Sequence, residues 1–261
     1  MATKIQLRQI DQDSASVSQV VSWNGSNWVA GNQSLIPVTQ FGAVLDGTTN
    51  DATAIQSAID TVGYAFFPYV EGSTVSSRIN SSILLNDGNK LFSNNRKFRL
   101  KAYTSSGSAT TAASYAIRME DTKVFDSGTT SIGAVEVSSI SIEILTAGAN
   151  GIWIRQNRRA KVDSVNLLGI NVTTPTSNIA IYIDDDVVAG VEDGSAWNYI
   201  NDFVIYKFIT GIHLDTTYDT LAYCNRNLIN NGLVQSCTNG VYMRYAYTNQ
   251  FLNVSVQNSD I

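Results

Sequence analysis

The clearest pattern in the chain is a four-residue unit, two aliphatic positions around one ring-bearing position, that returns at a nearly constant interval. The units Gly-Ile-Trp-Ile, Ala-Ile-Tyr-Ile, Gly-Ile-His-Leu and Gly-Val-Tyr-Met begin at residues 151, 180, 211 and 240, in steps of 29, 31 and 29 residues. A second apolar series runs through residues 162–167, 200–205, 229–234 and 252–256, and its two middle members are also 29 residues apart. Two series with one period indicate a solenoid of strands. From about residue 135 the sequence therefore predicts a coil in which each turn stacks on the one before.

Alternation along these strands assigns some side chains to the core and others to the surface. The inward set is aliphatic: Ile152, Ile154, Ile181, Ile183, Ile212, Leu214, Val241 and Met243. The position between each inward pair faces outward and forms a column of rings: Trp153, Tyr182, His213 and Tyr242. Because rings on a solvent face need a partner, we expect this column to meet either the neighbouring subunit of a trimer or the rings of a glycan. His213, the only histidine, has no second histidine with which to bind a metal and is interpreted as a stacked ring.

The next outward column is charged and contains Arg155, Asp184, Asp215 and Arg244. Adjacent strands lie about 4.8 Å apart, so Asp184 and Asp215 are predicted neighbours. Two such carboxylates suit the acid and base of a glycosidase, because their mutual repulsion raises one pKa. A lyase would instead need a cation beside its base, and Arg155 or Arg244 meets that need. The alternative is two surface ion pairs, Arg155–Asp184 and Asp215–Arg244, that only neutralise each other.

Two long loops leave one corner of the predicted coil, within residues 184–199 and 215–223. They mix acidic residues with aromatic residues that are candidates for glycan binding: Trp197, Tyr199, Tyr218 and Tyr223. Packed turns with solvated acids are the alternative. The run of three aspartates at 184–186 lacks a recognised calcium-loop spacing, so we expect no metal and no cofactor.

Residues 1–35 have a different character. Residues 20–29 read as a β-hairpin in which Asn24-Gly25 forms the tight turn between Trp23 and Trp28. The segment is too short for a core of its own, so we expect it to dock or to oligomerise. The Lys-Ile-Gln-Leu-Arg-Gln-Ile strand followed by this hairpin resembles the N-terminal segments of phage tail fibres. That resemblance implies a virion anchor; the alternative is an aromatic hairpin that binds carbohydrate.

Residues 38–72 read as a strand, a glycine-bearing turn, a helix and a short strand that ends at Pro68. Asn50 or Asp51 can cap the helix, and the carboxylates of Asp46 and Asp51 are interpreted as structural. The Phe-Gly-Ala, Asp-Gly, Thr-x-Asp and Phe-Pro signatures of this block resemble the entry module of the pectate-lyase-like superfamily found in phage tailspikes. The sequence departs from that pattern at Asn50, Ala52 and Tyr69, which affects capping and turn geometry.

The resemblance covers residues 36–102 directly and implies a right-handed parallel β-helix whose mouth is capped by the helix. The predicted fold is therefore all-β: this β-helix, a short N-terminal capping helix and a small N-terminal β-hairpin anchor. The expected divisions are residues 1–35 for virion anchoring and trimerisation, 36–102 for the entry module and 103–261 for the coils.

Composition restricts the function. The charged fraction is 15%, the net charge is −5 and the pI is near 4.8, which excludes a nucleic-acid binder with a basic stripe. Two basic clusters, Arg96, Lys97, Arg99 and Lys101 and, further on, Arg158, Arg159 and Lys161, are interpreted as solvated turns. Cys224 and Cys237 are expected to be reduced and packed. Neither a secretion signal nor a membrane-spanning run is recognised, so we expect no membrane insertion.

These features together predict a homotrimeric component of a phage tail fibre or tailspike that is assembled in the bacterial host cytoplasm and becomes part of the virion. Its N-terminus is expected to dock on other tail or baseplate proteins and its β-helix to bind polysaccharide on the host surface. Whether it is also a depolymerase, as a glycoside hydrolase or a lyase, is left open. A purely structural fibre or adaptor and a secreted polysaccharide lyase are the alternatives. Because residues 250–261 stop within a coil, we also expect a longer chain or a partner to cover that end.

Overall fold

The computed structural model describes residues 20–23, 28–31 and 35–259, apart from gaps at residues 74, 87, 121–133, 156, 171–174, 185–192 and 217–221. The chain divides into two units, residues 1–36 and residues 37–261. In the first unit, β1 (Val20–Trp23) and β2 (Trp28–Gly31) pair antiparallel with Trp23 opposite Trp28, in agreement with the predicted hairpin. The side chains of both tryptophans lie outside the described part of the chain.

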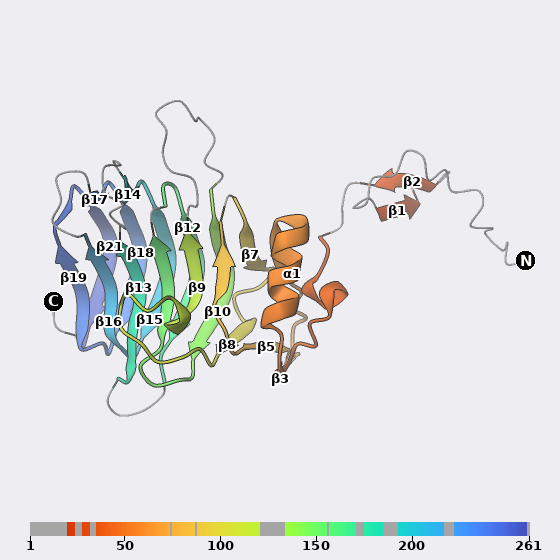
Figure 1. Ribbon diagram of the computed structural model, residues 1–261, viewed down its shortest axis with the longest axis horizontal. Coiled ribbons are helices and arrows are strands. Elements are labelled where there is room, and N and C mark those ends of the chain that lie inside the picture. The colour runs from red at the N-terminus through yellow and green to blue at the C-terminus, as the bar shows by residue number, and fades with distance from the viewer. Residues whose placement is uncertain are drawn as a thin grey trace, which may run out of the picture. The chain divides into compact units, whose positions relative to one another are not determined.

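The second unit begins with a short 3-10 helix η3 (Val38–Phe41), strand β3 (Asp46–Asn50), helix α1 (Ala52–Val62) and strand β4 (Tyr64–Phe67). The helix buries Ile55, Ala58 and Ile59, which are the positions that helical spacing selects. It stands across the end of the stacked strands, as the resemblance implied (Figure 1). The fold of this entry is therefore as predicted.

The carboxylates of the entry bind backbone groups. Asp46 Oδ1 accepts hydrogen bonds from the N–H groups of Thr48 at 2.8 Å and Thr49 at 2.7 Å. Asn50 Oδ1 accepts from Ala52 N at 3.3 Å, so Asn50 caps the helix. Buried Asp51 makes no cap; it accepts from Val44 N at 2.8 Å, Leu45 N at 3.2 Å and Ser77 Oγ at 2.8 Å. Asp51 thus ties the entry loop to the first coil.

Three parallel sheets form the walls of the coil. The long sheet contains β3, β4, β5 (Ser76–Ile79), β7 (Lys90–Ser93), β8 (Arg99–Ala102), β10 (Glu136–Ile144), β12 (Lys161–Leu168), β15 (Tyr199–Tyr206), β18 (Leu228–Gln235) and β21 (Gln250–Gln257). The ring-bearing sheet contains β6 (Ile83–Leu85), β9 (Tyr115–Glu120), β11 (Asn150–Arg155), β13 (Ser177–Asp184), β16 (Phe208–Asp215) and β19 (Asn239–Arg244). The short sheet contains β14 (Asp193–Ala196), β17 (Ala222–Asn225) and β20 (Ala246–Tyr247).

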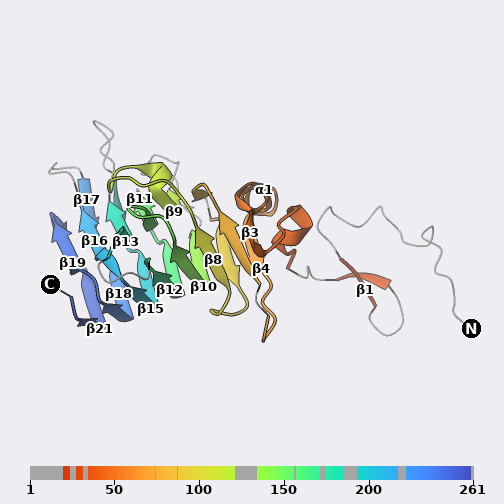
Figure 2. The same cartoon turned by 90° about the horizontal axis from the view of Figure 1, so that it is seen from below.

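From β12 onward the chain visits the long, the ring-bearing and the short sheet in turn, and strands of successive coils pair in parallel. Figure 2 shows neighbouring strands of the long sheet in their spatial order, from β8 through β10, β12, β15 and β18 to β21. The second unit is a right-handed parallel β-helix, as predicted, with the handedness that parallel crossovers require.

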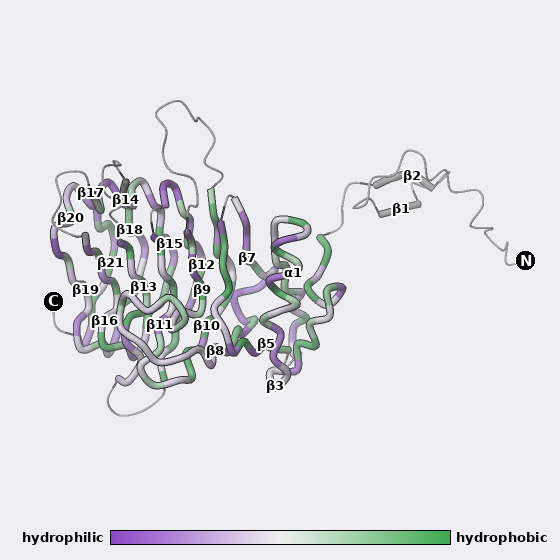
Figure 3. Tube along the Cα trace, viewed as in Figure 1, coloured by the Kyte–Doolittle hydropathy of each residue, from purple (hydrophilic) through white to green (hydrophobic). Residues whose placement is uncertain are grey.

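The register confirms the predicted core. Ile152 pairs with Ile181, Ile181 with Ile212 and Ile212 with Val241. The three isoleucines are fully buried. Polar and apolar residues alternate along the strands (Figure 3), because successive side chains point to opposite faces. Met243 is the exception among the predicted inward residues and is 53% exposed, since β19 is the edge strand of its sheet. The two cysteines are free and buried, as expected.

Two further columns turn the corners of the coil. Every long strand from β10 onward contains one residue with a φ of 48° to 56°, and the column consists of Ser139, Ser164, Asp202, Asn231 and Asn253. Asn and Asp tolerate this left-handed conformation better than most residues. At the corner before the long sheet, Asn198 Nδ2 donates to Asn227 Oδ1 and Asn227 Nδ2 to Asn249 Oδ1, both at 2.9 Å. This asparagine ladder was not predicted, although each asparagine comes two residues before an inward apolar position.

Candidate functional site

The predicted carboxylate pair lies at the ends of two adjacent strands. Asp184 ends β13 and Asp215 ends β16, and the preceding residues Ile183 and Leu214 pair in register. The two aspartates therefore occupy neighbouring coils, where the sequence put them. Their side chains do not stand on an open surface, however: Asp184 is 7% exposed and Asp215 is 6% exposed. Their catalytic role stays a prediction.

Asp215 forms a bidentate ion pair with Arg244, one of the alternatives that the sequence left open. Arg244 Nε donates to Asp215 Oδ1 at 2.7 Å and Arg244 Nη2 to Oδ2 at 2.6 Å. The hydrogen bond and charge of Asp215 raise the pKa of Arg244. A bidentate ion pair of this kind suits a structural role better than the role of a general acid.

The groups beside this pair are neutral. Burial lowers the pKa of His213 below its ordinary value, although Asp215, at 3.7 Å from Nε2, favours the charged form. Burial, followed by the charge of Asp184, raises the pKa of Tyr182 far above its ordinary value. Both shifts favour the uncharged forms of the imidazole and the phenol at neutral pH.

The predicted column of rings is present, with Trp153 and Tyr182 stacked, Tyr182 and His213 tilted, and His213 and Tyr242 edge to face. Ring centroids are 6.1 Å apart for Trp153 and Tyr182, 4.8 Å for Tyr182 and His213, and 4.6 Å for His213 and Tyr242. The prediction that the column faces solvent is wrong for its first two members: Trp153 is 2% exposed and Tyr182 is 4% exposed. Tyr242, on the edge strand β19, is 43% exposed.

The segment of residues 103–114 covers the buried rings. Ala109 and Ala112 pack against a cluster formed by Tyr115, Trp153, Ile179 and Tyr182. Hydrogen bonds hold the segment in place: Asn150 Nδ2 donates to Ser114 Oγ at 2.7 Å, Tyr115 Oη to Ala109 O at 2.7 Å, and Asn178 Nδ2 to Gly107 O at 2.6 Å. Trp153 and Tyr182 therefore already have a partner within the chain. Strand alternation could not reveal this, because the covering segment is not part of the repeat.

Two of the predicted glycan-binding aromatics, Trp197 and Tyr199, have described side chains, and both lie at the corner before the long sheet. Trp197 follows β14 at the corner before the long sheet and is 45% exposed, with Arg226 at 5.4 Å and Arg158 at 6.0 Å from its ring. Tyr199 begins β15 and is half-buried. Tyr218 lies outside the described residues, and of Tyr223 only the backbone in β17 is described.

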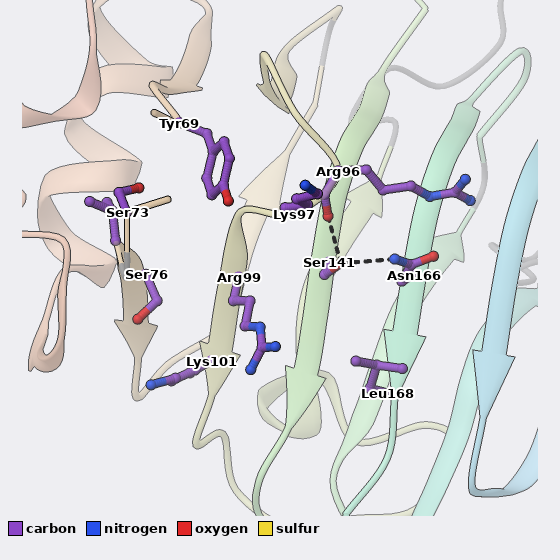
Figure 4. A pocket seen from close by; sticks show the side chains of 11 residues that line it. Tyr69, Ser73, Ser76, Arg96, Lys97, Arg99, Lys101, Ser141, Asn166 and Leu168 are labelled. Atoms are coloured by element: carbon purple, nitrogen blue, oxygen red, sulfur yellow. Dashed lines mark hydrogen bonds between the residues drawn. The ribbon is translucent and has the colours of Figure 1, made fainter. Parts of the chain in front are cut away.

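A separate hollow of about 660 Å³ lies on the outer face of the long sheet (Figure 4). We call it the basic groove, because four of the residues that line it are cations: Arg96, Lys97, Arg99 and Lys101. Ser76 on β5, Ser141 on β10 and Asn166 and Leu168 on β12 continue its floor, and Tyr69, Ser73 and Val75 form one side. The groove therefore joins the entry module to the first complete coils.

Strand alternation explains why two of the cations point outward. Arg99 and Lys101 flank Leu100 on β8, and Leu100 is fully buried. Arg99 pairs in register with Ser76 on one side and Ser141 on the other, so all three side chains share the outer face. The charges and hydroxyls of the groove thus stand on a rigid sheet.

The cations of the groove are partly neutralised. Three of them meet a carboxylate that is not part of the lining: Arg96 with Asp202 at 3.0 Å, Lys97 with Glu71 at 2.5 Å and Arg99 with Glu143 at 3.1 Å. Lys101 makes no ion pair with any residue that the structure describes. The groove therefore has a surplus positive charge at Lys101.

The prediction that this cluster is a solvated turn is wrong for two of its four residues. Arg96 and Lys97 do lie in a turn, but Arg99 and Lys101 belong to β8. Their spacing of two residues around an apolar residue is the signal that would have placed both on one face of a strand.

Within the ranges that the structure describes, no helix has the length and apolar character needed to cross a lipid bilayer. Among the same residues, no three His, Cys, Asp or Glu side chains come together as a set of metal ligands.

No protein-family model and no curated protein matches the sequence. In structure, the chain is similar to PfbA, a surface adhesin of Streptococcus pneumoniae, with a TM-score of 0.53 and 17% identity over 83% of this chain and 61% of that one. It is also similar to tailspike protein 3 of bacteriophage CBA120, with a TM-score of 0.47, 10% identity and coverage of 86% and 43%. The Dettilon tailspike protein matches with a TM-score of 0.32 and 15% identity over 84% of this chain and 49% of that one. The chain spans less than two thirds of each of these proteins, and the likeness to the adhesin supports the β-helical fold.

Proposed function

We propose that this chain is a component of a phage tail fibre or tailspike and binds polysaccharide on the host cell surface through the basic groove. The observation that carries the proposal is the groove itself: an open, polar hollow on a rigid outer sheet, with the tyrosine ring of Tyr69 beside it. Pockets for small apolar ligands are enclosed and mostly hydrophobic. A hydrated polymer of sugars fits an open polar groove better.

The groove offers the groups that recognise sugars. Ser141 Oγ donates to Arg96 O at 2.7 Å and accepts from Asn166 Nδ2 at 3.0 Å, so the floor is ordered before any ligand binds. Asn166 keeps its amide oxygen as an acceptor for a sugar hydroxyl. Tyr69 offers a ring that can stack on the apolar face of a sugar. Preorganised groups of this kind reduce the entropy lost on binding.

The same proposal gives the N-terminal unit the role of virion anchor and trimerisation segment, docking on other tail or baseplate proteins. A two-stranded antiparallel sheet is too small to be stable alone, which supports a docked state. The proposed protein is a homotrimer, assembled in the bacterial cytoplasm and located in the virion.

Cleavage of the polysaccharide is a second candidate function with one supporting observation, the position of Asp184 and Asp215 on adjacent strands. Their burial and the ion pair of Asp215 with Arg244 favour a structural role instead. A lyase mechanism needs a free cation, and Arg244 is neutralised by Asp215. We therefore favour binding over cleavage, and a structural fibre without glycan chemistry is the result expected if the groove binds nothing.

Binding is tested by filling the groove. Leu168 faces outward on β12, so Leu168→Trp places a larger side chain in the hollow without entering the core. The matched control is Tyr206→Trp, because Tyr206 pairs with Leu168 in the next strand and lies outside the groove. Binding to an array of bacterial capsular polysaccharides should fall at least about tenfold for Leu168→Trp and stay unchanged for the control. Equal binding by both variants would place the contact elsewhere.

Cleavage is tested separately. The full chain is incubated with each polysaccharide that it binds, and new reducing ends and unsaturated products are measured. If they form, Asp184→Asn and Asp215→Asn should abolish them, whereas Asp46→Asn, in the entry turn, should not. If no products form, the depolymerase hypothesis is wrong for these glycans and the binding proposal stands.

A further inference from the structure

We infer that the basic groove recognises an acidic glycan, with an anionic group of the sugar held between Lys101 and the side of the groove formed by Tyr69 and Ser73. This inference rests on the proposed function and deepens it, because it names the chemical class of the polysaccharide. Three independent observations support it.

The first observation is the distribution of charge. The chain carries a net charge of −5, yet the lining of the groove contains four cations and no carboxylate. Three of the cations are balanced by Glu71, Glu143 and Asp202, and Lys101 is not balanced by any described residue. An acidic sugar would supply the missing negative charge. A nucleic acid would need a continuous basic stripe to neutralise its phosphates, which one surplus charge does not provide.

The second observation is that Gly47 lets Lys101 Nζ and Ser76 Oγ lie close together. A Cβ atom built on Gly47 would lie 3.0 Å from Lys101 Nζ and 2.3 Å from Ser76 Oγ. Gly47 has a φ of 73°, a conformation that favours glycine. In Figure 4 the Lys101 side chain extends from β8 toward the side of β5, the strand that carries Ser76. Glycine at this position therefore lets the half-exposed ammonium of Lys101 and the buried hydroxyl of Ser76 lie close to the same backbone, and the ammonium is the group that a carboxylate or sulfate of a ligand would meet.

The third observation is a pair of polar atoms in the groove wall whose hydrogen-bonding capacity is not used. Ser73 Oγ and Arg96 Nε are shielded from solvent but have no hydrogen-bond partner among the described residues. Buried donors without partners are rare because they cost stability. Both residues line the groove, so these two atoms belong to its wall.

The test uses an array on which glycans bearing uronate, sialate, pyruvate, sulfate or phosphate groups stand beside neutral glycans of the same length. The full chain should bind one or more acidic glycans at least about tenfold more tightly than the neutral counterparts. That binding should weaken by about tenfold or more between 50 mM and 500 mM salt, because salt screens exposed charges. Lys101→Gln should lose about tenfold or more in affinity for the acidic glycan, since a charge-assisted hydrogen bond is removed.

Two variants serve as controls. Lys101→Arg keeps the charge and should retain most of the binding, which separates a role in recognition from a role in folding. Lys90→Gln removes an outward lysine of β7 that lies outside the groove and 3.8 Å from Glu136, and it should bind as the unmodified chain does.

The outcomes separate this inference from the proposed function. If neutral glycans bind as tightly as acidic ones and Lys101→Gln has no effect, the inference that the ligand is acidic is wrong. The proposal that the chain binds glycans is then retained. If Leu168→Trp and Lys101→Gln both leave the binding of an acidic glycan intact, the groove is not its site. If no glycan on the array binds, both proposals are overturned.

Discussion

Arg96 and Asp202 are 106 positions apart in the chain, yet Arg96 Nη1 donates to Asp202 Oδ1 at 3.0 Å. Arg96 belongs to the turn before β8, and its side chain passes two strands, β10 and β12, to reach β15. On the way Arg96 Nη2 donates to Val165 O at 3.4 Å, and it also donates to Asp202 O. Arg96 therefore connects the entry module to the third coil and forms a fixed wall of the basic groove.

Asp202→Asn should destabilise the protein slightly at neutral pH. Asparagine tolerates the φ of 48° at this position, so the change removes mainly the charge. The hydrogen bond from Ser164, then the hydrogen bond and charge of Arg96, lower the pKa of Asp202. Because the pair is half-exposed, we expect a loss of under about 1 kcal/mol in the free energy of unfolding, measured with urea at pH 7.

The pH dependence checks the cause of that loss. A lowered pKa in the folded state contributes stability above the ordinary value of 3.8, and the contribution disappears as the pH falls through the folded-state pKa. The difference between Asp202→Asn and the unmodified chain should therefore shrink from pH 7 to pH 3. A difference that is the same at both pH values would show that the charge is not its source.

Gly232→Ala should destabilise the core. Gly232 pairs with Phe203 on the neighbouring strand, and a Cβ atom on residue 232 would lie 1.9 Å from Phe203 Cζ. Phe203 is 1% exposed, so its ring has no room to move outward. Overpacking of this kind costs about 1–3 kcal/mol in the free energy of unfolding, measurable by urea denaturation.

A second substitution tests the mechanism of that loss. Phe203→Leu shortens the side chain that occupies the space above residue 232. The double variant Gly232→Ala/Phe203→Leu should be more stable than the sum of the two single effects indicates. Additive effects would mean that the alanine methyl group does not meet the phenylalanine ring.

Arg244→Gln should lower the melting temperature because it leaves the buried carboxylate of Asp215 without its bidentate partner. Asp215→Asn/Arg244→Gln removes both charges and should be less destabilised than Arg244→Gln alone, since an unpaired buried charge is worse than none. Differential scanning calorimetry of the two variants gives the comparison. The reverse order would show that the Arg244 side chain stabilises through packing instead.

The stability of the protein should fall below about pH 6.5 through His213. Burial lowers the pKa of His213 in the folded state, so between that value and 6.5 the unfolded chain binds more protons and unfolding becomes easier. The groups that face the imidazole are the rings of Tyr182 and Tyr242 and the charges of Asp215 and Arg244. His213→Phe keeps a ring in the column but does not titrate.

The measurement is the free energy of unfolding at pH 7.5 and pH 5.5 for both proteins. The unmodified chain should lose more stability over this range than His213→Phe does. Equal losses would mean that other groups, such as carboxylates, cause the whole effect.

Repetition made much of the fold predictable. The interval between Ile152 and Ile181 is repeated along the chain, and each repeat places an equivalent residue at the same position of the coil. Local alternation then separates inward from outward side chains. The aliphatic core, the column of rings and the neighbouring positions of Asp184 and Asp215 follow from these two rules.

What lies over the outer face was decided by contacts between distant parts of the chain. Trp153 and Tyr182 are buried because residues 103–114 cover them. Arg96 closes one wall of the groove because Asp202 holds its guanidinium three coils away from its own turn. The sequence alone thus determined the order of the coils and which side chains point inward or outward. Both properties depend on residues that are close together or regularly spaced in the chain. The tertiary structure decided which outward side chains remain open to a ligand, because exposure depends on segments that follow no period.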